Sequence, residues 1–379
     1  MAVLIALATG LGVGIGALER ASRRGMAQAA DAFDLIVGAP GGPAPLVLAA
    51  VYLQPEAVPL LDPAVTARVL AEPEAVWSSP IGFGDSWRGH PVVGVGPAFL
   101  TRAGTRRLAA GRGFEAEEEA VAGSSVAAAL GETFSPIHGL VETHEGHVHS
   151  EIGYRIVGRL PPTGTPWDNA VLVPIESVWE IHGLGNGHPK GVERVGPPWE
   201  EPGGVPAIVV KPRSIAGAYQ LRARYRTAAS TAVFPGEVLA GLFRTLGDVR
   251  SVLSGVALAT SALVVVAVLL AFTALTAGRA REHAVLRAIG ARPGFIAAAL
   301  WLELSAILVV GIGGGLLLGW VGAAAAGAAL ARTTGVGVAV GLGWPEVSLA
   351  MATLGACAVA SVIPAWLGSR VAPGAMLKR

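Results

Sequence analysis

Residues 279–293 read Arg-Ala-Arg-Glu-His-Ala-Val-Leu-Arg-Ala-Ile-Gly-Ala-Arg-Pro, and this basic stretch separates two long apolar runs. The run before it, residues 252–277, carries no charged side chain, and the run after it, residues 294–320, carries one acid. Each run exceeds the ~20 residues that a helix needs to cross the hydrocarbon core of a bilayer. Because short arginine-rich loops face the cytoplasm, the sequence predicts a cytoplasmic turn between two membrane helices. Such a turn offers a contact site to an intracellular partner.

The composition extends this prediction to the whole chain. Apolar residues make up 52% of the 379 residues and charged residues 15%, which is too apolar for an ordinary soluble protein. The sequence predicts an α-helical membrane protein with four transmembrane helices, at residues 1–18 and at about 252–277, 295–320 and 344–367. A large extracytoplasmic α/β domain, residues 19–246, is inserted between helices 1 and 2. Residues 247–379 form the second membrane part, with the cytoplasmic loop at 278–294.

The first apolar run, residues 2–18, allows two interpretations. It lacks the basic residues that precede the core of a signal peptide, so we interpret it as a membrane helix rather than a cleaved signal. It spans only ~25 Å at about 1.5 Å per residue. We therefore expect either a thin membrane region or residues missing upstream. The arginines that follow, at 20, 23 and 24, depart from the positive-inside rule if that side is external.

The middle region carries the pattern of a mixed α/β domain. Short β-branched or apolar segments between turn residues predict strands at 34–38, 91–95, 154–160, 170–174 and 207–211. Helices are predicted at 62–71, 124–130, 176–183 and 214–226. Residues 161–166 read as a rigid turn and 183–204 as a loop. The amphipathic segment from Pro235 runs into the second crossing and predicts a continuous stalk helix.

Glycines recur along the third apolar run, at 311, 313–315, 319 and 322. Such small residues let two membrane helices approach closely. A packing seam and a plain compositional bias toward glycine are both open at this point.

Several kinds of chemistry have no support in the sequence. The three lysines, Lys190, Lys211 and Lys378, do not follow the glycine of a phosphate-binding loop, so ATP hydrolysis is expected in a separate partner. The net charge of +1 gives no reason to expect nucleic-acid binding. The single cysteine, Cys357, excludes a disulfide within the chain and a cysteine-based metal site. Glu303 is the clear intramembrane acid, and we expect a structural role for it rather than proton relay.

A histidine-rich loop is the candidate metal site. His144, His147 and His149 lie close together in the sequence, with Glu142, Glu145 and His138 nearby. Zinc and copper accept imidazole and carboxylate ligands. A solvated polar loop is the alternative interpretation.

The last third of the chain resembles a known family. Residues 281–292, flanked by apolar helices, resemble the signature loop of FtsX-like permeases, the family that includes the MacB macrolide exporter. The ending Ile363-Pro364-Ala365-Trp366, followed by Arg370-Val371-Ala372-Pro373, resembles the C-terminal ending of that family. Residues 34–39 and 162–166 resemble a MacB-like outer domain in a poorly characterised branch. Members usually have a cytoplasmic stretch before the first crossing, and the sequence departs from them there.

The resemblance implies a permease subunit of an ABC transporter in the bacterial inner (plasma) membrane. Such permeases are homodimers that work with two copies of a separate ATPase. The resemblance implies that the loop docks on that ATPase through Arg281, Glu282, Arg287 and Arg292, with Gly290 and Ala291 closing its short helix. ATP-driven motion would then reach the outer domain through the helices. A plain basic cytoplasmic turn is the alternative interpretation of these charges.

Three functions remain open at the level of the sequence. The first is export of a substrate, or its extraction from the outer leaflet, with a membrane-fusion protein as an expected partner. The second is mechanical control of an extracytoplasmic partner such as a cell-wall hydrolase. The third is a metal-binding or metal-export module that depends on the histidine-rich loop. The sequence does not name the cargo.

Overall fold

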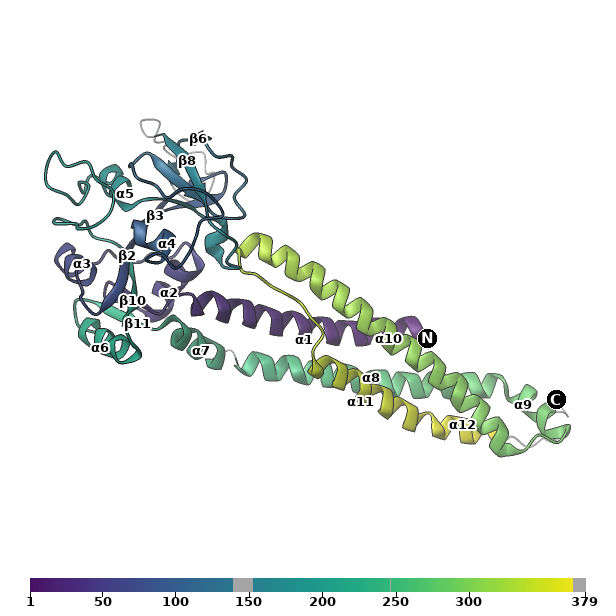
Figure 1. The fold of residues 1–379 in the computed structure, drawn as a ribbon. Coiled ribbons are helices and arrows are strands. Elements are labelled where there is room, and N and C mark those ends of the chain that lie inside the picture. The colour runs from purple at the N-terminus through teal and green to yellow at the C-terminus, as the bar shows by residue number, and fades with distance from the viewer. Residues whose placement is uncertain (139–152, 246, 371–379) are drawn as a thin grey trace. The chain divides into compact units, whose positions relative to one another are not determined.

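The chain divides into two units, each with its own packing. The computed structural model describes residues 1–138, 153–245 and 247–370. The helical unit consists of Met1–Arg23, Leu246–Leu330 and Val338–Arg379, and the sheet unit of Arg24–Thr245 and Ala331–Gly337. Figure 1 shows the course of the chain through both.

The helical unit is built from long apolar helices. Its elements are most of α1 (Ala2–Asp31), α8 (Gly247–Gly278), α9 (Ala280–Ala288), most of α10 (Pro293–Thr334), α11 (Trp344–Ala360) and α12 (Val362–Ser369). Among the described residues, four helical stretches are long and apolar enough to cross a membrane: Ala2–Asp31, Leu258–Gly278, Pro293–Thr334 and Trp344–Ser369. The break between α11 and α12 precedes Pro364, whose nitrogen cannot donate to the carbonyl four residues earlier.

Glycines bring α1 and α10 into close contact. A Cβ atom added to Gly315 would lie 2.7 Å from the Cβ of Thr9, and one added to Gly319 would lie 2.5 Å from the carbonyl oxygen of Gly10. Neither position has room for a side chain. The glycine-rich face of α10 is therefore a packing seam, and Gly10 and Gly14 of α1 form its other half.

The sheet unit contains an eleven-stranded sheet in the order β11-β1-β10-β2-β3-β9-β5-β8-β4, with β6 paired to β8 and β7 to β2. The pairs β3–β9 and β5–β8 are parallel, and the other pairs are antiparallel. The strands are β1 (Leu35–Gly38), β2 (Ala75–Trp87), β3 (His90–Val95), β4 (Ala110–Gly111), β5 (Glu119–Ala122), β6 (Thr133–Phe134), β7 (Ile137–His138), β8 (Tyr154–Arg159), β9 (Val171–Pro174), β10 (Ala207–Pro212) and β11 (Thr231–Val233).

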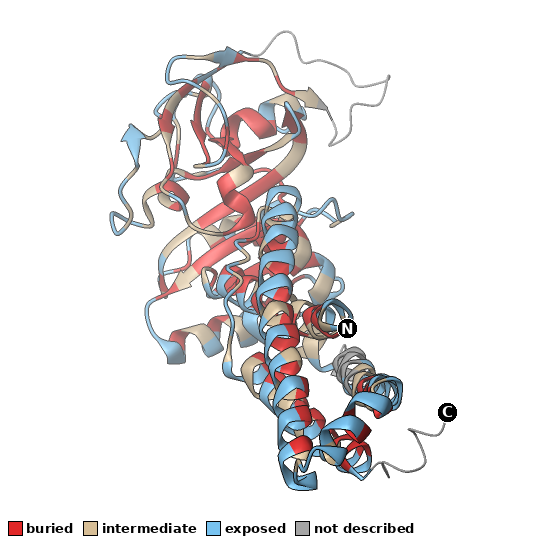
Figure 2. Ribbon diagram, turned by 90° about the vertical axis from the view of Figure 1, so that its right-hand side faces the viewer, coloured by how far each residue is buried: buried red, intermediate tan, exposed pale blue. Residues whose placement is uncertain are grey.

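Both faces of this sheet are buried. Successive strand residues point to opposite sides, so neighbouring residues of one strand lie in two different cores. Ile36, Val209 and Leu172 lie in one core, and their neighbours Leu35, Val210 and Val173 lie in the other. The first core is completed by α2 (Pro43–Tyr52), α4 (Pro97–Thr101), α7 (Pro235–Thr245) and the end of α1. The second is completed by α3 (Pro63–Leu70), α5 (Ile175–Ile181) and α6 (Ile215–Tyr225). Figure 2 shows the buried residues following the strands.

The fold class predicted from the sequence is confirmed. Four helices of transmembrane length are present among the described residues, and a mixed α/β sheet domain lies between the first and the later ones. Two helices run beyond the expected spans: α1 continues to Asp31, and α10 continues to Thr334. The expected stalk consists of α7 and α8, which flank position 246, a position outside the described residues.

The helix predicted at residues 124–130 is wrong. These residues form turns, because other parts of the sheet unit take their backbone groups. The Arg159 guanidinium donates to the carbonyls of Gly123, Val126 and Ala128, and the Ser125 N–H donates to the Asp168 carbonyl at 2.8 Å. Carbonyls held by a distant arginine are not available for a helical ladder.

Candidate functional site

The predicted cytoplasmic turn folds as the short helix α9 followed by a tight reversal. Beyond the helix, Gly290 has a φ of +102°, a left-handed conformation that glycine adopts without strain. The Ala291 N–H donates to the Leu286 carbonyl at 3.0 Å, and the Gly290 N–H donates to the Arg287 carbonyl at 3.1 Å. This pair of bonds is a Schellman motif, which satisfies the last carbonyls of a helix. Gly290 and Ala291 thus close α9, and Pro293 begins α10 at once.

One face of α9 is buried and the other is exposed. His283 and Ala284 are buried, whereas Arg281 and Glu282 are exposed. The exposed residues also include apolar side chains: Val285, Leu286 and Ile289, the last of them 77% exposed, and Phe295 beyond the turn, 70% exposed. We call Arg281, Glu282, Val285, Leu286, Ile289 and Phe295 the α9 contact face. A surface that joins large apolar side chains to charges is typical of a protein-binding site.

The apolar half of this face was not part of the sequence prediction, which considered the charges. The signal was present, since Val285, Leu286 and Ile289 interrupt a basic helix at spacings of one, three and four residues. Only the structure separates the apolar residues that pack inward from those that stay exposed.

Two arginines near α9 have partners within the helical unit. The Arg287 guanidinium donates to the Ser369 carbonyl at 3.2 Å, at the end of α12. Arg279 donates to both carboxylate oxygens of Glu303, at 2.9 and 3.2 Å. A cation near the last carbonyls of a helix is stabilising, so Arg287 helps to hold α12. The Arg279–Glu303 pair gives Glu303 an ion-pair partner within the helical unit.

The predicted metal site, His144, His147 and His149, lies outside the described residues. Across the ranges that the structure does describe, no group of three or more histidine, cysteine, aspartate or glutamate residues is placed to hold a metal ion. Metal binding at the histidine-rich loop stays a prediction.

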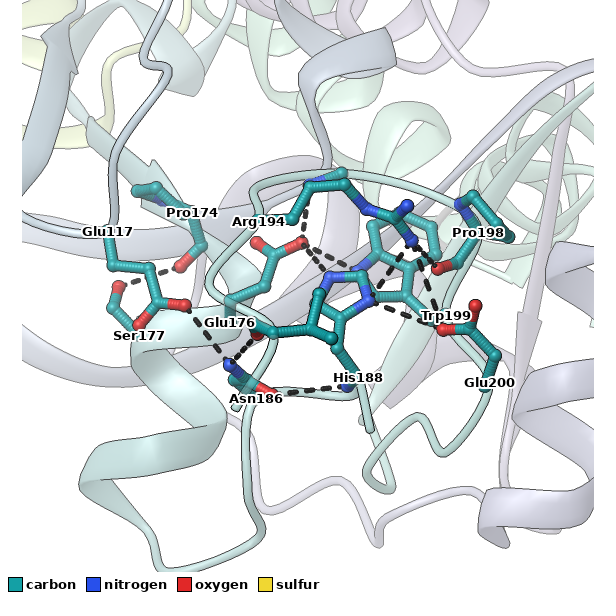
Figure 3. A network of polar contacts seen from close by, with 12 residues as sticks. Glu117, Pro174, Glu176, Ser177, Asn186, His188, Arg194, Pro198, Trp199 and Glu200 are labelled. Carbon is teal, nitrogen blue, oxygen red and sulfur yellow. Dashed lines mark hydrogen bonds and ion pairs between the residues drawn. The ribbon is translucent and has the colours of Figure 1, made fainter. Parts of the chain in front are cut away.

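The sheet unit contains a buried polar network that the sequence did not reveal (Figure 3). Its centre is Glu176 on α5, which is fully buried. One oxygen of Glu176, Oε1, accepts from the Gly196 N–H at 2.7 Å and from the Trp199 indole Nε1 at 2.6 Å. The other, Oε2, has no hydrogen-bond partner among the residues described. Glu176 therefore anchors the long loop that leads from α5 to β10.

His188 of the same loop faces Glu176. Its side chain is fully buried, with Nε2 3.9 Å from Glu176 Oε1. On the other side of the ring, Nδ1 lies 3.4 Å from a carboxylate oxygen of Glu200 and 3.3 Å from the Arg194 guanidinium. Asn186 extends the network, because its side-chain nitrogen donates to Glu117 at 3.5 Å and to the Val192 carbonyl at 3.1 Å.

Burial and like charges shift the carboxyl groups of this network. Burial raises the pKa of Glu176 above its ordinary value, against the hydrogen bonds from Gly196 and Trp199. Burial and the neighbouring Glu180 carboxylate raise the pKa of Glu117 to about 7. Glu117 therefore takes up a proton near neutral pH. The hydrogen bonds of Glu176 to Gly196 and Trp199 fix the loop between α5 and β10 on α5.

Comparisons with known proteins give one family match and one structural match. The family model described as FtsX-like permease C-terminal matches residues 254–373, a range that includes α9, α10 and α11. The chain is also similar to the crystal structure of the periplasmic region of MacB from Actinobacillus actinomycetemcomitans. That match has 12% sequence identity and a TM-score of 0.33, and it covers 55% of this chain and 91% of that chain. A search of curated proteins finds no match. The resemblance noted in the sequence is confirmed for the C-terminal part: residues 254–373 match the FtsX-like permease C-terminal domain, in a chain whose described residues include four helices long and apolar enough to cross a membrane.

Proposed function

We propose that this chain is the permease subunit of an ABC transporter in a bacterial plasma membrane. A separate ATPase binds the α9 contact face from the cytoplasm. The chain works as a homodimer, and the sheet unit lies on the extracytoplasmic side. ATP-driven motion of the ATPase shifts the membrane helices and, through them, the sheet unit. The outcome is export of a substrate or its extraction from the outer leaflet.

One observation carries this proposal. The α9 contact face presents Arg281 and Glu282 beside exposed Val285, Leu286 and Ile289, on a helix that is fixed at its end by Gly290. Large exposed apolar side chains beside charges mark surfaces that bind a protein or a membrane, and on this helix of nine residues between two membrane-length helices we assign the surface to the ATPase. The match of residues 254–373 to the FtsX-like family supports the same partner.

The closest test is ATPase stimulation in proteoliposomes. The tagged chain is purified from its native membrane with the ABC ATPase that accompanies it, and the hydrolysis rate of the complex is compared with that of the ATPase alone. We expect Glu282→Ala and Ile289→Ala to lower the stimulation roughly tenfold, as the loss of about 1.4 kcal/mol of contact energy would. Leu302→Ala is the matched control, because Leu302 is an exposed apolar residue of α10 away from the α9 contact face. Unchanged stimulation in both Glu282→Ala and Ile289→Ala would remove the assignment of α9.

A further inference from the structure

The outer end of the third membrane helix is built into the sheet unit. Helix α10 begins at Pro293, directly after the turn that closes α9, and its 42 residues continue to Thr334. At about 1.5 Å per residue this is a single rod of roughly 60 Å. Its last turn and the residues after it, Ala331–Gly337, belong to the sheet unit. One continuous helix therefore leads from the α9 turn to residues that belong to the sheet unit, of which Val336 is buried.

The residues after α10 pack backbone to backbone on the turn 163–169. The Gly337 N–H donates to the Gly164 carbonyl at 3.0 Å. A Cβ added to Gly335 would lie 2.8 Å from the Cα of Pro166, and Gly335 has a φ of +69°. Because no side chain separates the two segments, a displacement of one cannot be absorbed by a change of rotamer in the other.

The end of α1 closes the other side of this contact. A Cβ added to Gly25 would lie 2.3 Å from the Gly337 carbonyl oxygen and 3.0 Å from a methyl group of Val336. Val336 itself is 6% exposed and lies in the same core as Trp167. The segment 335–337 is thus held between α1 and the turn, with a buried anchor in the middle. We call Gly25, Gly164–Pro166 and Gly335–Gly337 the α10 seat.

Asp168 fixes the turn 163–169 of the seat through hydrogen bonds. Its carboxylate accepts from the N–H groups of Thr163, at 2.9 and 3.0 Å, and of Gly164, at 2.7 Å. It also accepts from the Thr163 hydroxyl at 2.7 Å. Charge-assisted bonds from several donors to one buried carboxylate fix the turn in a single conformation. The segment 161–166, which the sequence predicts as a rigid turn, therefore contacts the residues that follow α10.

We propose that the α10 seat is the point at which movement of the third membrane helix enters the sheet unit. The proposal rests on the proposed function, since it takes α9 as the source of the movement. A shift of the α9 turn reaches Pro293 within a few residues, and α10 carries it along its axis. The seat passes it on through backbone contact with the 163–169 turn and, through Val336, with the core around Trp167.

The test measures the nucleotide response of the sheet unit in the full chain bound to its ATPase. Spin labels are attached through ketone-bearing residues at positions 130 and 344, which are 51% and 79% exposed. The distance distribution between them is recorded without nucleotide and with ATP and vanadate. Gly337→Val places a side chain in the seat, where a Cβ would lie in tight contact with Gly164, 3.2 Å from its carbonyl oxygen and 3.4 Å from its Cα. Gly341→Val is the matched control, because a Cβ at Gly341 meets nothing within 4 Å.

We expect the nucleotide-dependent shift in the wild type and in Gly341→Val, and its loss in Gly337→Val, while ATPase stimulation persists in all three. A full shift in Gly337→Val would overturn the α10 seat and leave the proposed function intact. No shift in the wild type would overturn both. Loss of ATPase stimulation in the α9 variants supports the proposed function. Loss of the nucleotide-dependent shift in Gly337→Val supports the α10 seat.

A second variant covers the case in which Gly337→Val does not fold. Pro166→Cys and Gly335→Cys are combined in a Cys357→Ala background, where the short distance across the seat favours a disulfide. The proposal expects the oxidised protein to keep its nucleotide-dependent shift, since the seat stays closed while it transmits. Loss of the shift on oxidation, with recovery on reduction, would show that the seat must open and would overturn the proposal.

Discussion

Arg20 of α1 and Glu346 of α11 form an ion pair although they are 326 residues apart in the sequence. The Glu346 side chain is 5% exposed and that of Arg20 is 18% exposed. Glu346 also accepts from the Gly343 N–H at 2.9 Å, and Arg20 also donates to the Gly341 carbonyl at 2.7 Å. The pair ties α1 to α11 and gives Arg20 an anionic partner.

Breaking this ion pair should destabilise the helical unit strongly. Arg20→Ala leaves a buried carboxylate without its cation, and we expect the free energy of unfolding to fall by about 3–5 kcal/mol. Thermal melting in detergent measures this, and the exchanged pair Arg20→Glu with Glu346→Arg should recover much of the loss. Lys211→Ala removes an exposed pair with Asp34 and should cost under about 1 kcal/mol. Equal effects of both alanine variants would contradict a buried tie.

The glycine seam between α1 and α10 makes a steric prediction. A methyl group on Gly319 would lie 2.5 Å from the Gly10 carbonyl oxygen, so Gly319→Ala must push the two helices apart. We expect a loss of about 1–3 kcal/mol, seen as a lower melting temperature. At Gly322 a Cβ meets nothing within 4 Å, and Gly322→Ala should be neutral or stabilise by up to about 1 kcal/mol. If both substitutions behave alike, α1 and α10 do not pack along this seam.

Glu176 should hold the loop between α5 and β10. Glu176→Ala leaves the Gly196 N–H and the Trp199 indole N–H without their acceptor, at a cost of about 1–3 kcal/mol for each buried group. We expect faster limited proteolysis within residues 183–204. Glu201→Ala is the control, because Glu201 is an exposed carboxylate of the same loop. Proteolysis that is equally slow in both variants would show that the loop is held by other contacts.

Glu117 predicts a dependence of stability on pH. Because its pKa is raised to about 7 in the folded chain, the folded state holds a proton that the unfolded chain releases near its ordinary pKa of 4.5. This contribution to stability is fully present below about 4.5 and is lost as the pH rises through about 7. Solvent screening limits it to on the order of 1 kcal/mol. Glu117→Gln should flatten the difference in melting temperature between pH 5 and pH 8, and an unaltered difference would assign it to other groups.

The helices were the most predictable part of this fold. Uncharged runs longer than a membrane crossing and the Gly290 that closes α9 are local signals, and residues 279–293 contain nearly all the information that α9 needs. Five of the eleven described strands, β1, β3, β8, β9 and β10, also have local signals, as in Ala207–Pro212, where branched apolar residues follow one another.

Strand β2, the longest in the sheet, was missed for a physical reason. Its thirteen residues include Pro80, Gly82 and Gly84, which are unfavourable in strands taken alone. The structure accommodates them by close packing. Cβ atoms at Gly82 and at Gly94 of the paired strand would clash with Ile175 and Val178 of α5, so these glycines make room for the helix. Such a requirement depends on an element about ninety residues away and leaves no local trace.

The same limit explains which site residues were found. The charges of the α9 contact face could be predicted, because they follow each other in sequence. The Glu176 network could not, since it joins α5 to residues of a loop that had no pattern of its own. The α10 seat combines residues near positions 25, 165 and 336, which only the folded chain brings together.

In the proposed complex the α9 contact face touches the ATPase. A photo-crosslinking amino acid at position 289, compared with one at position 344, tests this directly in the native membrane. Both positions are strongly exposed in the helical unit, at 77% and 79%. We expect an adduct between the chain and its ATPase at position 289 and none at position 344. No adduct at 289, or equal adducts at both positions, would contradict it.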